Sequence, residues 1–166
     1  MNILYIHGLN GSLSPEKRAI LEQYGEVYSP FIDYEVIPDS ITKLSASYHN
    51  RKIDVIIGSS MVGFAGYYVS NVLQCPALLF NPALAERSVY QNVPNIQYKK
   101  SPFKQIVLGT RDDVVEPKGT LNFLADTLDT HPNHQIQVYN DLAHRIPVDI
   151  FIKEVAIFME YISRQQ

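Results

Sequence analysis

The stretch that decides the fold runs from Lys52 to Asn71 and reads KIDVIIGSSMVGFAGYYVSN. Its apolar run over 53–57 predicts a strand that is buried on both faces, and the run over 61–73 predicts a buried helix. Almost no residues remain between them for a loop. So sharp a turn forces Ser60 into a sparsely populated backbone conformation. Small neighbours such as Gly58 are needed, because the helix folds straight back against the strand.

A turn of this kind presents its central side chain above the sheet, at the first turn of a helix. Backbone N–H groups there have no acceptor within the helix, so they can stabilise an anion that forms beside the Ser60 hydroxyl. Gly58 lies two residues before Ser60, as this turn requires, whereas Ile57 lies two residues before Ser59. The sequence therefore favours Ser60 as a nucleophile, against the alternative that the two serines only cap the helix.

Strand-like and helix-like segments alternate along the whole chain. The expected strands are 3–6, 26–29, 53–57, 77–80, 104–108 and 136–139, and the expected helices are 14–21, 41–49, 61–73, 118–128 and 148–161. This alternation predicts a single α/β domain over residues 1–166, a three-layer α/β/α sandwich with a mainly parallel sheet of about six strands. The segment 83–102 has no periodicity, and we interpret it as a short cap or lid.

In such sheets ligands bind outside the carboxyl ends of the strands, and reactive residue types collect there in this sequence. Ser60 follows the third expected strand, Asp112 follows the fifth, and His144 follows the sixth. A serine needs a base to take its proton, and the base needs an acid that orients it. The chain order Ser60, Asp112, His144 is typical of the α/β-hydrolase fold. Asp113 remains an alternative to Asp112 as the acid, and we expect His7 to support the site without transferring protons.

Five motifs together resemble small bacterial α/β-hydrolases, in particular the YqiA-like esterase family. They are LYIHGLNGS from Leu4, IIGSSMVG from Ile56, LLFNPAL from Leu78, VLGTRDDVV from Val107 and AHR from Ala143. The resemblance covers nearly the whole chain and implies a compact serine esterase that needs no cofactor or metal. By position it implies these roles: nucleophile Ser60, acid Asp112, base His144, and oxyanion-binding N–H groups of Met61 and Leu9, with Asn10 as the alternative to Leu9.

The sequence departs from the family pattern at Val62, where a glycine usually stands two residues after the serine. A β-branched side chain at that contact should push the helix outward unless the residue that faces it is small. The glycine often found shortly before the histidine is also missing. We expect an open site, because 83–102 is short for a lid. Apolar residues of that segment are candidates for an acyl-binding wall: Leu84, Val89, Tyr90, Val93 and Ile96.

The sequence thus predicts an enzyme that hydrolyses a small-molecule substrate, either a carboxylic ester or a thioester. Two alternatives remain, a non-catalytic binding protein of the same fold and a hydrolase of peptide or amide bonds.

The net charge of −3 argues against a nucleic-acid surface. A single cysteine, Cys75, excludes an internal disulfide and fits a reducing compartment. We find no signal peptide or membrane-spanning run, and we expect a cytoplasmic monomer or weak homo-oligomer.

Overall fold

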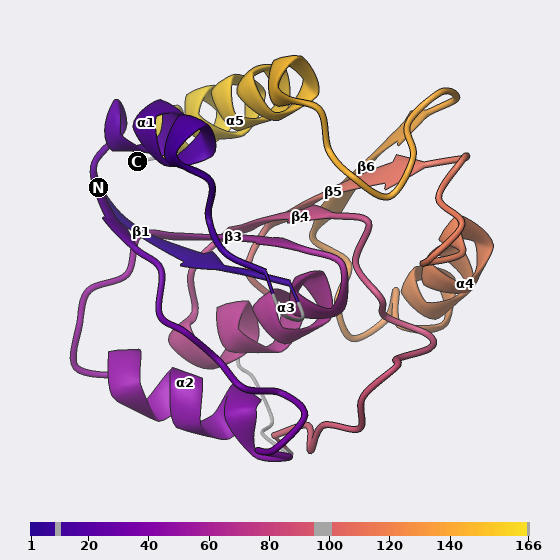
Figure 1. Ribbon diagram of the computed structural model, residues 1–166, viewed down its shortest axis with the longest axis horizontal. Helices are drawn as coiled ribbons and strands as arrows, with labels where there is room; N and C mark the ends of the chain where they lie inside the picture. The colour runs from indigo at the N-terminus through magenta and orange to yellow at the C-terminus, as the bar shows by residue number, and fades with distance from the viewer. Residues whose placement is uncertain (9–10, 95–100, 166) are drawn as a thin grey trace.

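The computed structural model describes residues 1–8, 11–94 and 101–165 (Figure 1). Within these ranges, six strands form one sheet in which every neighbouring pair runs parallel. The strands are β1 (Asn2–Ile6), β2 (Glu26–Tyr28), β3 (Val55–Ser59), β4 (Ala77–Phe80), β5 (Lys104–Gly109) and β6 (His134–Tyr139). Their order in space is β2-β1-β3-β4-β5-β6.

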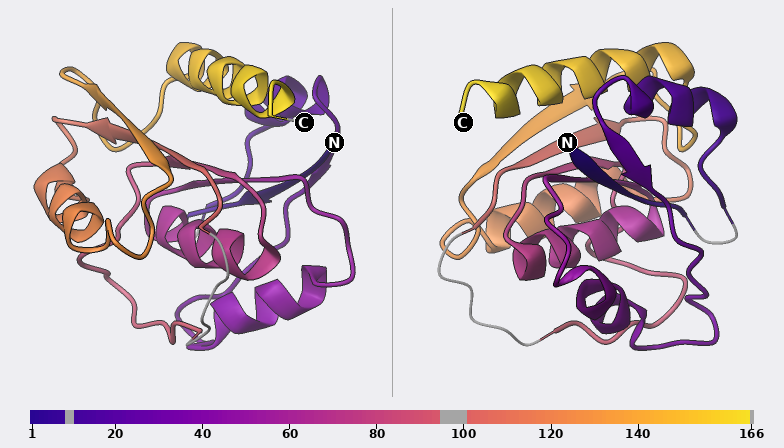
Figure 2. Two further views of the ribbon diagram at one scale, coloured as in Figure 1. Left: turned by 180° about the vertical axis from the view of Figure 1, so that it is seen from behind. Right: turned by 90° about the vertical axis from the view of Figure 1, so that its left-hand side faces the viewer.

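Five helices among the described residues cover both faces of this sheet. They are α1 (Pro15–Glu22), α2 (Ser40–Tyr48), α3 (Met61–Leu73), α4 (Pro117–Asp126) and α5 (Val148–Ser163). Figures 1 and 2 show α1 and α5 on one face and α2, α3 and α4 on the other. The arrangement confirms the predicted α/β/α sandwich. None of the described helices is long and apolar enough to cross a membrane.

The hydrophobic core has two halves, one on each face of the sheet. Alternate residues of a strand point to opposite faces, so Ile56 joins the half beneath α2 and α3, while Val55 and Ile57 join the half beneath α1 and α5. Each of these three side chains is fully buried, which contributes about 1.5–3 kcal/mol per side chain. Burial on both faces explains why the central strands are continuous apolar runs in the sequence.

The strand order reverses direction between β1 and β3. From β1 the chain passes through α1 to β2 on one side, and it then returns through α2 to β3 on the other side of β1. Parallel α/β sheets bind ligands at such a reversal, outside the carboxyl ends of the two strands. The reversal places the turn at Ser60 beside the residues that follow β1, His7 and Gly8.

The segment after β4 contains no helix or strand over residues 81–94. It runs toward α2, where the buried Gln91 side chain donates to the carbonyls of Tyr34 (2.8 Å) and Ile37 (3.0 Å). Asn92 donates through its side chain to the Asp39 carboxylate at 2.6 Å. Residues 95–100 of the expected cap segment lie outside the described residues. Residues 91 and 92 are therefore hydrogen-bonded to the residues that precede α2. The action of the segment as a cap stays a prediction.

Candidate active site

Ser60 occupies the strained turn between β3 and α3 that the sequence predicts. Its φ of 64° and ψ of −135° lie in a region that non-glycine residues rarely adopt, at a cost of about 1–3 kcal/mol. Both backbone groups of Ser60 are paired. Its N–H donates to the carbonyl of Phe80 (2.9 Å), and its carbonyl accepts from the N–H of Ala83 (3.1 Å) and of Phe64 (3.3 Å). Contacts to β4, to the segment after it and to α3 therefore hold the strained residue in place.

Close packing around this turn explains how Val62 is accommodated. A Cβ atom on Gly58 would lie 2.9 Å from the carbonyl oxygen of Val62, so the residue that faces Val62 has to be glycine. A Cβ atom on Gly63 would lie 2.7 Å from Cα of Pro82, so the close approach to the segment after β4 occurs at Gly63. Val62 itself is fully buried in the core. The glycine that the family pattern places two residues after the serine is therefore replaced in function by Gly63, one residue further on.

Asp112 and His144 lie in direct contact, although 32 residues separate them in the chain. Nδ1 of His144 lies 2.9 Å from both carboxylate oxygens of Asp112. Oδ1 of Asp112 also accepts from the backbone N–H groups of Val114 (2.9 Å) and Val115 (2.8 Å), which fix the carboxylate. A proton on Nδ1 donates to this acceptor and leaves Nε2 as the acceptor of the ring. The competing carboxylate, Asp113, is exposed and makes no such contact.

Asn81 ties the end of β4 to the loop that carries His144. Its side-chain oxygen accepts from the N–H of Gly109 (2.8 Å), and its side-chain nitrogen donates to the carbonyls of Ala143 (3.0 Å) and His144 (3.4 Å). Asn81 is buried and has a φ of 41°, a conformation that asparagine tolerates better than most residues. Gly109 completes this contact, because a Cβ atom there would lie 2.2 Å from the Leu142 carbonyl oxygen. Asn81 lies within the LLFNPAL motif, and the sequence alone predicted no role for it.

Replacing Asn81 with alanine is expected to lower the free energy of unfolding by about 2–4 kcal/mol. The change leaves the Gly109 N–H and the Ala143 carbonyl without a partner, and each orphaned buried group costs about 1–3 kcal/mol. Asn81→Asp keeps the acceptor for Gly109, but it buries a carboxylate whose second oxygen faces the carbonyls of Ala143 and His144, so it should cost at least as much as the alanine variant. Urea unfolding of the three proteins measures this order, and equal stabilities of all three would contradict the role assigned to the Asn81 amide.

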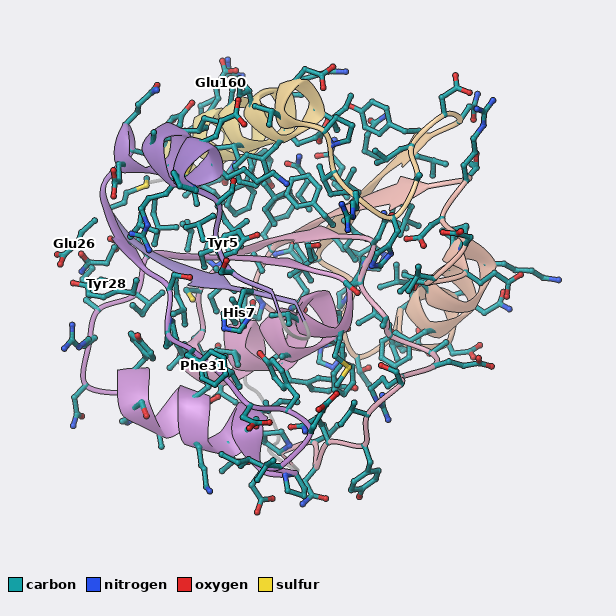
Figure 3. The ribbon with its side chains drawn as sticks, in the orientation of Figure 1. Tyr5, His7, Glu26, Tyr28, Phe31 and Glu160 are labelled. Atoms are coloured by element: carbon teal, nitrogen blue, oxygen red, sulfur yellow. The ribbon has the colours of Figure 1, made fainter. Side chains whose placement is uncertain are left out.

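His7 lies at the end of β1 and makes two hydrogen bonds that define its tautomer. Its Nδ1 lies 2.9 Å from the Gly8 carbonyl, an acceptor, and its Nε2 accepts from the N–H of Ile32 at 3.2 Å. The ring is buried and lies beside Phe31, with 5.8 Å between ring centroids (Figure 3). With both nitrogens engaged, the His7 ring joins the end of β1 to the backbone of Ile32, and its expected support of the site stays a prediction.

Ser60 and His144 line one pocket of about 660 Å³ at the carboxyl ends of the strands. Met61, whose N–H was expected to bind an oxyanion, lines it as well. The other lining residues are Tyr5, Gly8, Gly11, Ser12, Ser14, Lys17, Ser59, Ser88, Val114, Arg145 and Ile146. Among the described residues, no hydrogen bond joins Ser60 directly to His144. Catalytic hydrogen bonds are often long before a substrate binds, so a shared pocket is the relevant geometry.

Three of the predicted residues lie outside the described residues, and four others do not line the pocket. Leu9 and Asn10, the expected source of a second oxyanion N–H, lie outside the described residues, as does Ile96. The expectation of an acyl-binding wall from 83–102 is wrong for the four described candidates, since none lines the pocket. Leu84 is buried in the core, Val89 packs against it, and Tyr90 and Val93 are exposed. Ser88 of this segment does line the pocket, whereas the hydrogen bonds of Gln91 to Tyr34 and of Asn92 to Asp39 hold the following residues beside the start of α2.

Lys17 lines the pocket although nothing in the sequence places it there. It lies in α1, and its ammonium donates to the Ile146 carbonyl (2.9 Å), two residues after His144. The ammonium also lies 5.1 Å from the centroid of the Phe151 ring. Partial burial lowers the pKa of Lys17, against a smaller opposite effect of Glu16. Only the packing of α1 beside α5, from the two ends of the chain, brings this side chain to the site.

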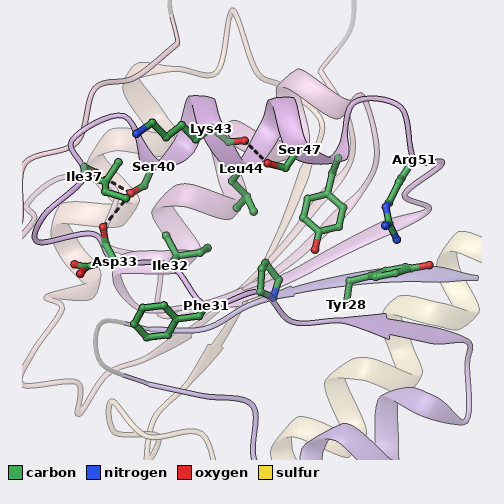
Figure 4. Close-up of a pocket in the computed structure, with 12 residues that line it drawn as sticks. Tyr28, Phe31, Ile32, Asp33, Ile37, Ser40, Lys43, Leu44, Ser47 and Arg51 are labelled. Atoms are coloured by element: carbon green, nitrogen blue, oxygen red, sulfur yellow. Dashed lines mark hydrogen bonds between the residues drawn. The ribbon is translucent and has the colours of Figure 1, made fainter.

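A second cavity, of about 430 Å³, lies between the segment after β2 and helix α2 (Figure 4). Phe31, Leu44 and Tyr48 contribute apolar surface, and Lys43 and Arg51 contribute cations. This second cavity is lined by none of the three candidate catalytic residues, Ser60, Asp112 and His144. Among the described residues, no group of three or more histidine, cysteine, aspartate or glutamate side chains is arranged to hold a metal ion.

Comparisons with known proteins agree with this architecture. Residues 2–114 match the model of a family described as "Uncharacterised protein family (UPF0227)". No curated protein sequence matches the chain.

Several solved structures are similar to it over nearly its whole length. Alpha/beta hydrolase domain-containing protein 10 from mouse has 13% sequence identity and a TM-score of 0.69, over 99% of this chain and 90% of that one. MGS-MChE2, an alpha/beta hydrolase from the metagenome of sediments of the Mar Chica lagoon in Morocco, has 13% identity and a TM-score of 0.69, over 99% and 91%. Esterase PE8 has 12% identity and a TM-score of 0.65, over 96% and 92%. At these identities the likeness concerns the fold, and it confirms the α/β-hydrolase fold.

Proposed function

Since the chain belongs to the UPF0227 family and has the α/β-hydrolase fold, we propose that it is a serine hydrolase that cleaves carboxylic esters or thioesters. Two facts about His144 carry the proposal together. Its Nδ1 lies 2.9 Å from the Asp112 carboxylate, and its side chain lines the same pocket as the strained Ser60. Side chains from three distant parts of the chain meet at the carboxyl edge of the sheet. A helix cap at Ser60 alone would require neither the histidine nor the buried carboxylate.

In the first half of the reaction, Oγ of Ser60 attacks the acyl carbon while Nε2 of His144 takes the hydroxyl proton. Asp112 holds the Nδ1–H of the ring and stabilises the imidazolium that forms. The N–H of Met61, at the first turn of α3, donates to the developing oxyanion, with the N–H of Leu9 or Asn10 as the second donor. The bond to the leaving group then breaks, and His144 returns the proton to the leaving alcohol or thiol.

In the second half, water attacks the acyl-enzyme and His144 takes a proton from it. The bond between Oγ and the acyl carbon breaks, the acid product leaves, and the proton returns to Ser60. The strained backbone of Ser60 supports this cycle, because it leaves the hydroxyl at the pocket instead of hydrogen-bonded to the first N–H groups of α3. Ser60 indeed makes no side-chain capping bond to the helix.

A fluorophosphonate probe tests the proposal, because it labels a serine only when a base activates the hydroxyl. We expect stoichiometric labelling of the wild type, and complete loss of labelling in Ser60→Ala. Ser59→Ala is the matched control, because Ser59 lines the same pocket one residue earlier, and it should retain labelling. An intact wild-type protein that never labels would contradict catalysis and favour the non-catalytic alternative. Peptide and ester substrates compared on the unlabelled wild-type enzyme then separate amide from ester hydrolysis.

A further inference from the structure

The pocket that contains Ser60 has an unbalanced charge. Lys17 and Arg145 are its two cationic lining residues, and none of its lining residues is an aspartate or glutamate. Asp112 lies behind His144, with a side chain that is fully buried. Ser12, Ser14 and Ser88 also line the pocket and carry neutral hydroxyl donors.

Neither cation forms an ion pair within 4.0 Å with a carboxylate among the described residues. Glu16 raises the pKa of Lys17 by less than burial lowers it. Among the described residues, the ion pairs within 4.0 Å involve other lysines and arginines, such as Arg111 with Asp141. The ammonium of Lys17 instead donates a hydrogen bond to the neutral Ile146 carbonyl and lies over the Phe151 ring. A partly buried ammonium without an ion-pair partner is held at a free-energy cost, which an anionic ligand would relieve.

The chemistry of the two side chains suits one kind of ligand group. Lys17 is held by its carbonyl contact and has further N–H donors, and Arg145 is an exposed guanidinium directly after His144. An ammonium and a guanidinium from residues that line one pocket can bind a carboxylate or another anionic group by charge-assisted hydrogen bonds.

Building on the proposed hydrolase function, we propose that the pocket selects esters that carry a negative charge, and that Lys17 and Arg145 bind that charge. The substrate is then an acidic ester, with the anionic group on either the acyl part or the alcohol part. Ser60 and His144 supply the reaction, while Lys17 and Arg145 decide which esters are placed correctly for it. The hydrogen bond of Lys17 to the Ile146 carbonyl also positions the loop after His144, so replacing Lys17 can lower the activity on every ester. The effect of charge is therefore measured as the ratio of kcat/KM for a charged ester to kcat/KM for its neutral counterpart.

Matched pairs of chromogenic esters test this. 4-Nitrophenyl hydrogen glutarate and its neutral methyl ester differ only by the charge on the acyl part. 4-Butyryloxybenzoate and its methyl ester differ in the charge on the leaving group, and dividing each kcat/KM by the rate constant of spontaneous hydrolysis corrects for the different pKa of the two phenols. For at least one pair we expect the wild type to prefer the charged member about tenfold or more in kcat/KM, since a charge-assisted hydrogen bond corresponds to about 10- to 100-fold. The pair that shows the preference identifies which part of the substrate is acidic.

The variants Lys17→Met and Arg145→Gln should each lower this preference, and the double variant should abolish it. Arg111→Gln is the control, because it removes the same charge from a surface ion pair outside the pocket, and it should keep the preference. Raising the salt concentration should reduce the preference in the wild type. Equal kcat/KM for both members of each pair, or a preference that survives in the double variant, overturns the inference while leaving the hydrolase function in place.

A binding measurement separates failure of this inference from failure of the proposed function. Calorimetric titration of Ser60→Ala with glutarate requires no turnover. Binding that weakens about tenfold or more when Arg145→Gln is added supports the anion site even if no ester is hydrolysed. Absence of glutarate binding together with absence of any charge preference refutes it.

Discussion

Replacing Asp112 with asparagine is expected to lower kcat about 10⁴-fold on any ester that the protein hydrolyses. The amide of asparagine can donate to Nδ1 of His144, which would then place the ring proton on Nε2, facing Ser60. A ring in that tautomer cannot take the serine proton. The carboxylate oxygens also lie 2.9 Å from Nδ1, so the variant removes the charge that stabilises the imidazolium. Steady-state kinetics on 4-nitrophenyl butyrate measures the effect.

Asp113→Asn is the matched control for this prediction. It makes the same chemical change one residue further on, at an exposed side chain that does not contact His144. We expect its kcat to stay within about twofold of the wild type, because surface substitutions away from special features have small effects. If Asp113→Asn loses activity and Asp112→Asn retains it, the acid has been assigned to the wrong carboxylate. Thermal unfolding of both variants separates a change in mechanism from a loss of fold.

The sequence predicted the elements that have strong periodicity or sharp boundaries. The helix over 61–73 and the strand over 77–80 match the structure to the residue, because long apolar runs end there at distinct turn residues. β6 was expected at 136–139 and begins at His134. It is an edge strand with polar residues, and only its pairing of His134 with Lys104 of β5 defines its start.

The candidate site divides in the same way. Ser60, Asp112 and His144 could be predicted because strand ends in a parallel sheet converge, whatever the details of packing. Lys17 could not, since it reaches the pocket through the packing of α1 against α5, and the acyl wall was misplaced because hydrogen bonds from Gln91 and Asn92 hold those residues beside the start of α2. Positions that follow from topology were predictable, and positions that follow from side-chain contacts between distant segments were not.

One buried cation makes the stability of the fold depend on pH. Lys104, the first residue of β5, is 1% exposed. Its ammonium donates to the side-chain oxygen of Asn71 (2.7 Å) and the carbonyl of Pro102 (3.2 Å), and it lies 4.7 Å from the centroid of the Tyr67 ring. No ion pair within 4.0 Å joins it to a carboxylate among the described residues. Burial lowers the pKa of Lys104 to about 7, while the nearby Cys75 acts in the opposite direction.

The free energy of unfolding of the wild type, compared with Lys104→Met, should therefore rise with pH between about 7 and 10.5. Above pH 7 the folded protein releases the Lys104 proton, whereas the unfolded chain keeps it until its ordinary pKa of 10.5. The unfolded state binds more protons in this interval, so the folded state gains at most about 5 kcal/mol across it. Below pH 7 both states are protonated, and the cost of the buried charge is constant.

Urea unfolding of the wild type and Lys104→Met at half-unit steps from pH 6 to 11 measures this difference. Tyr34, whose pKa burial raises, is common to both proteins and cancels in the comparison. Cys75 and His131 do not cancel fully, because the charge of Lys104 lowers the pKa of both groups in the wild type. Lys52→Met, at a side chain that is 89% exposed, is the matched control and should follow the wild-type profile. Parallel profiles for wild type and Lys104→Met would mean that the buried amine keeps its proton on folding, and that Asn71, Pro102 and the Tyr67 ring together replace its hydration.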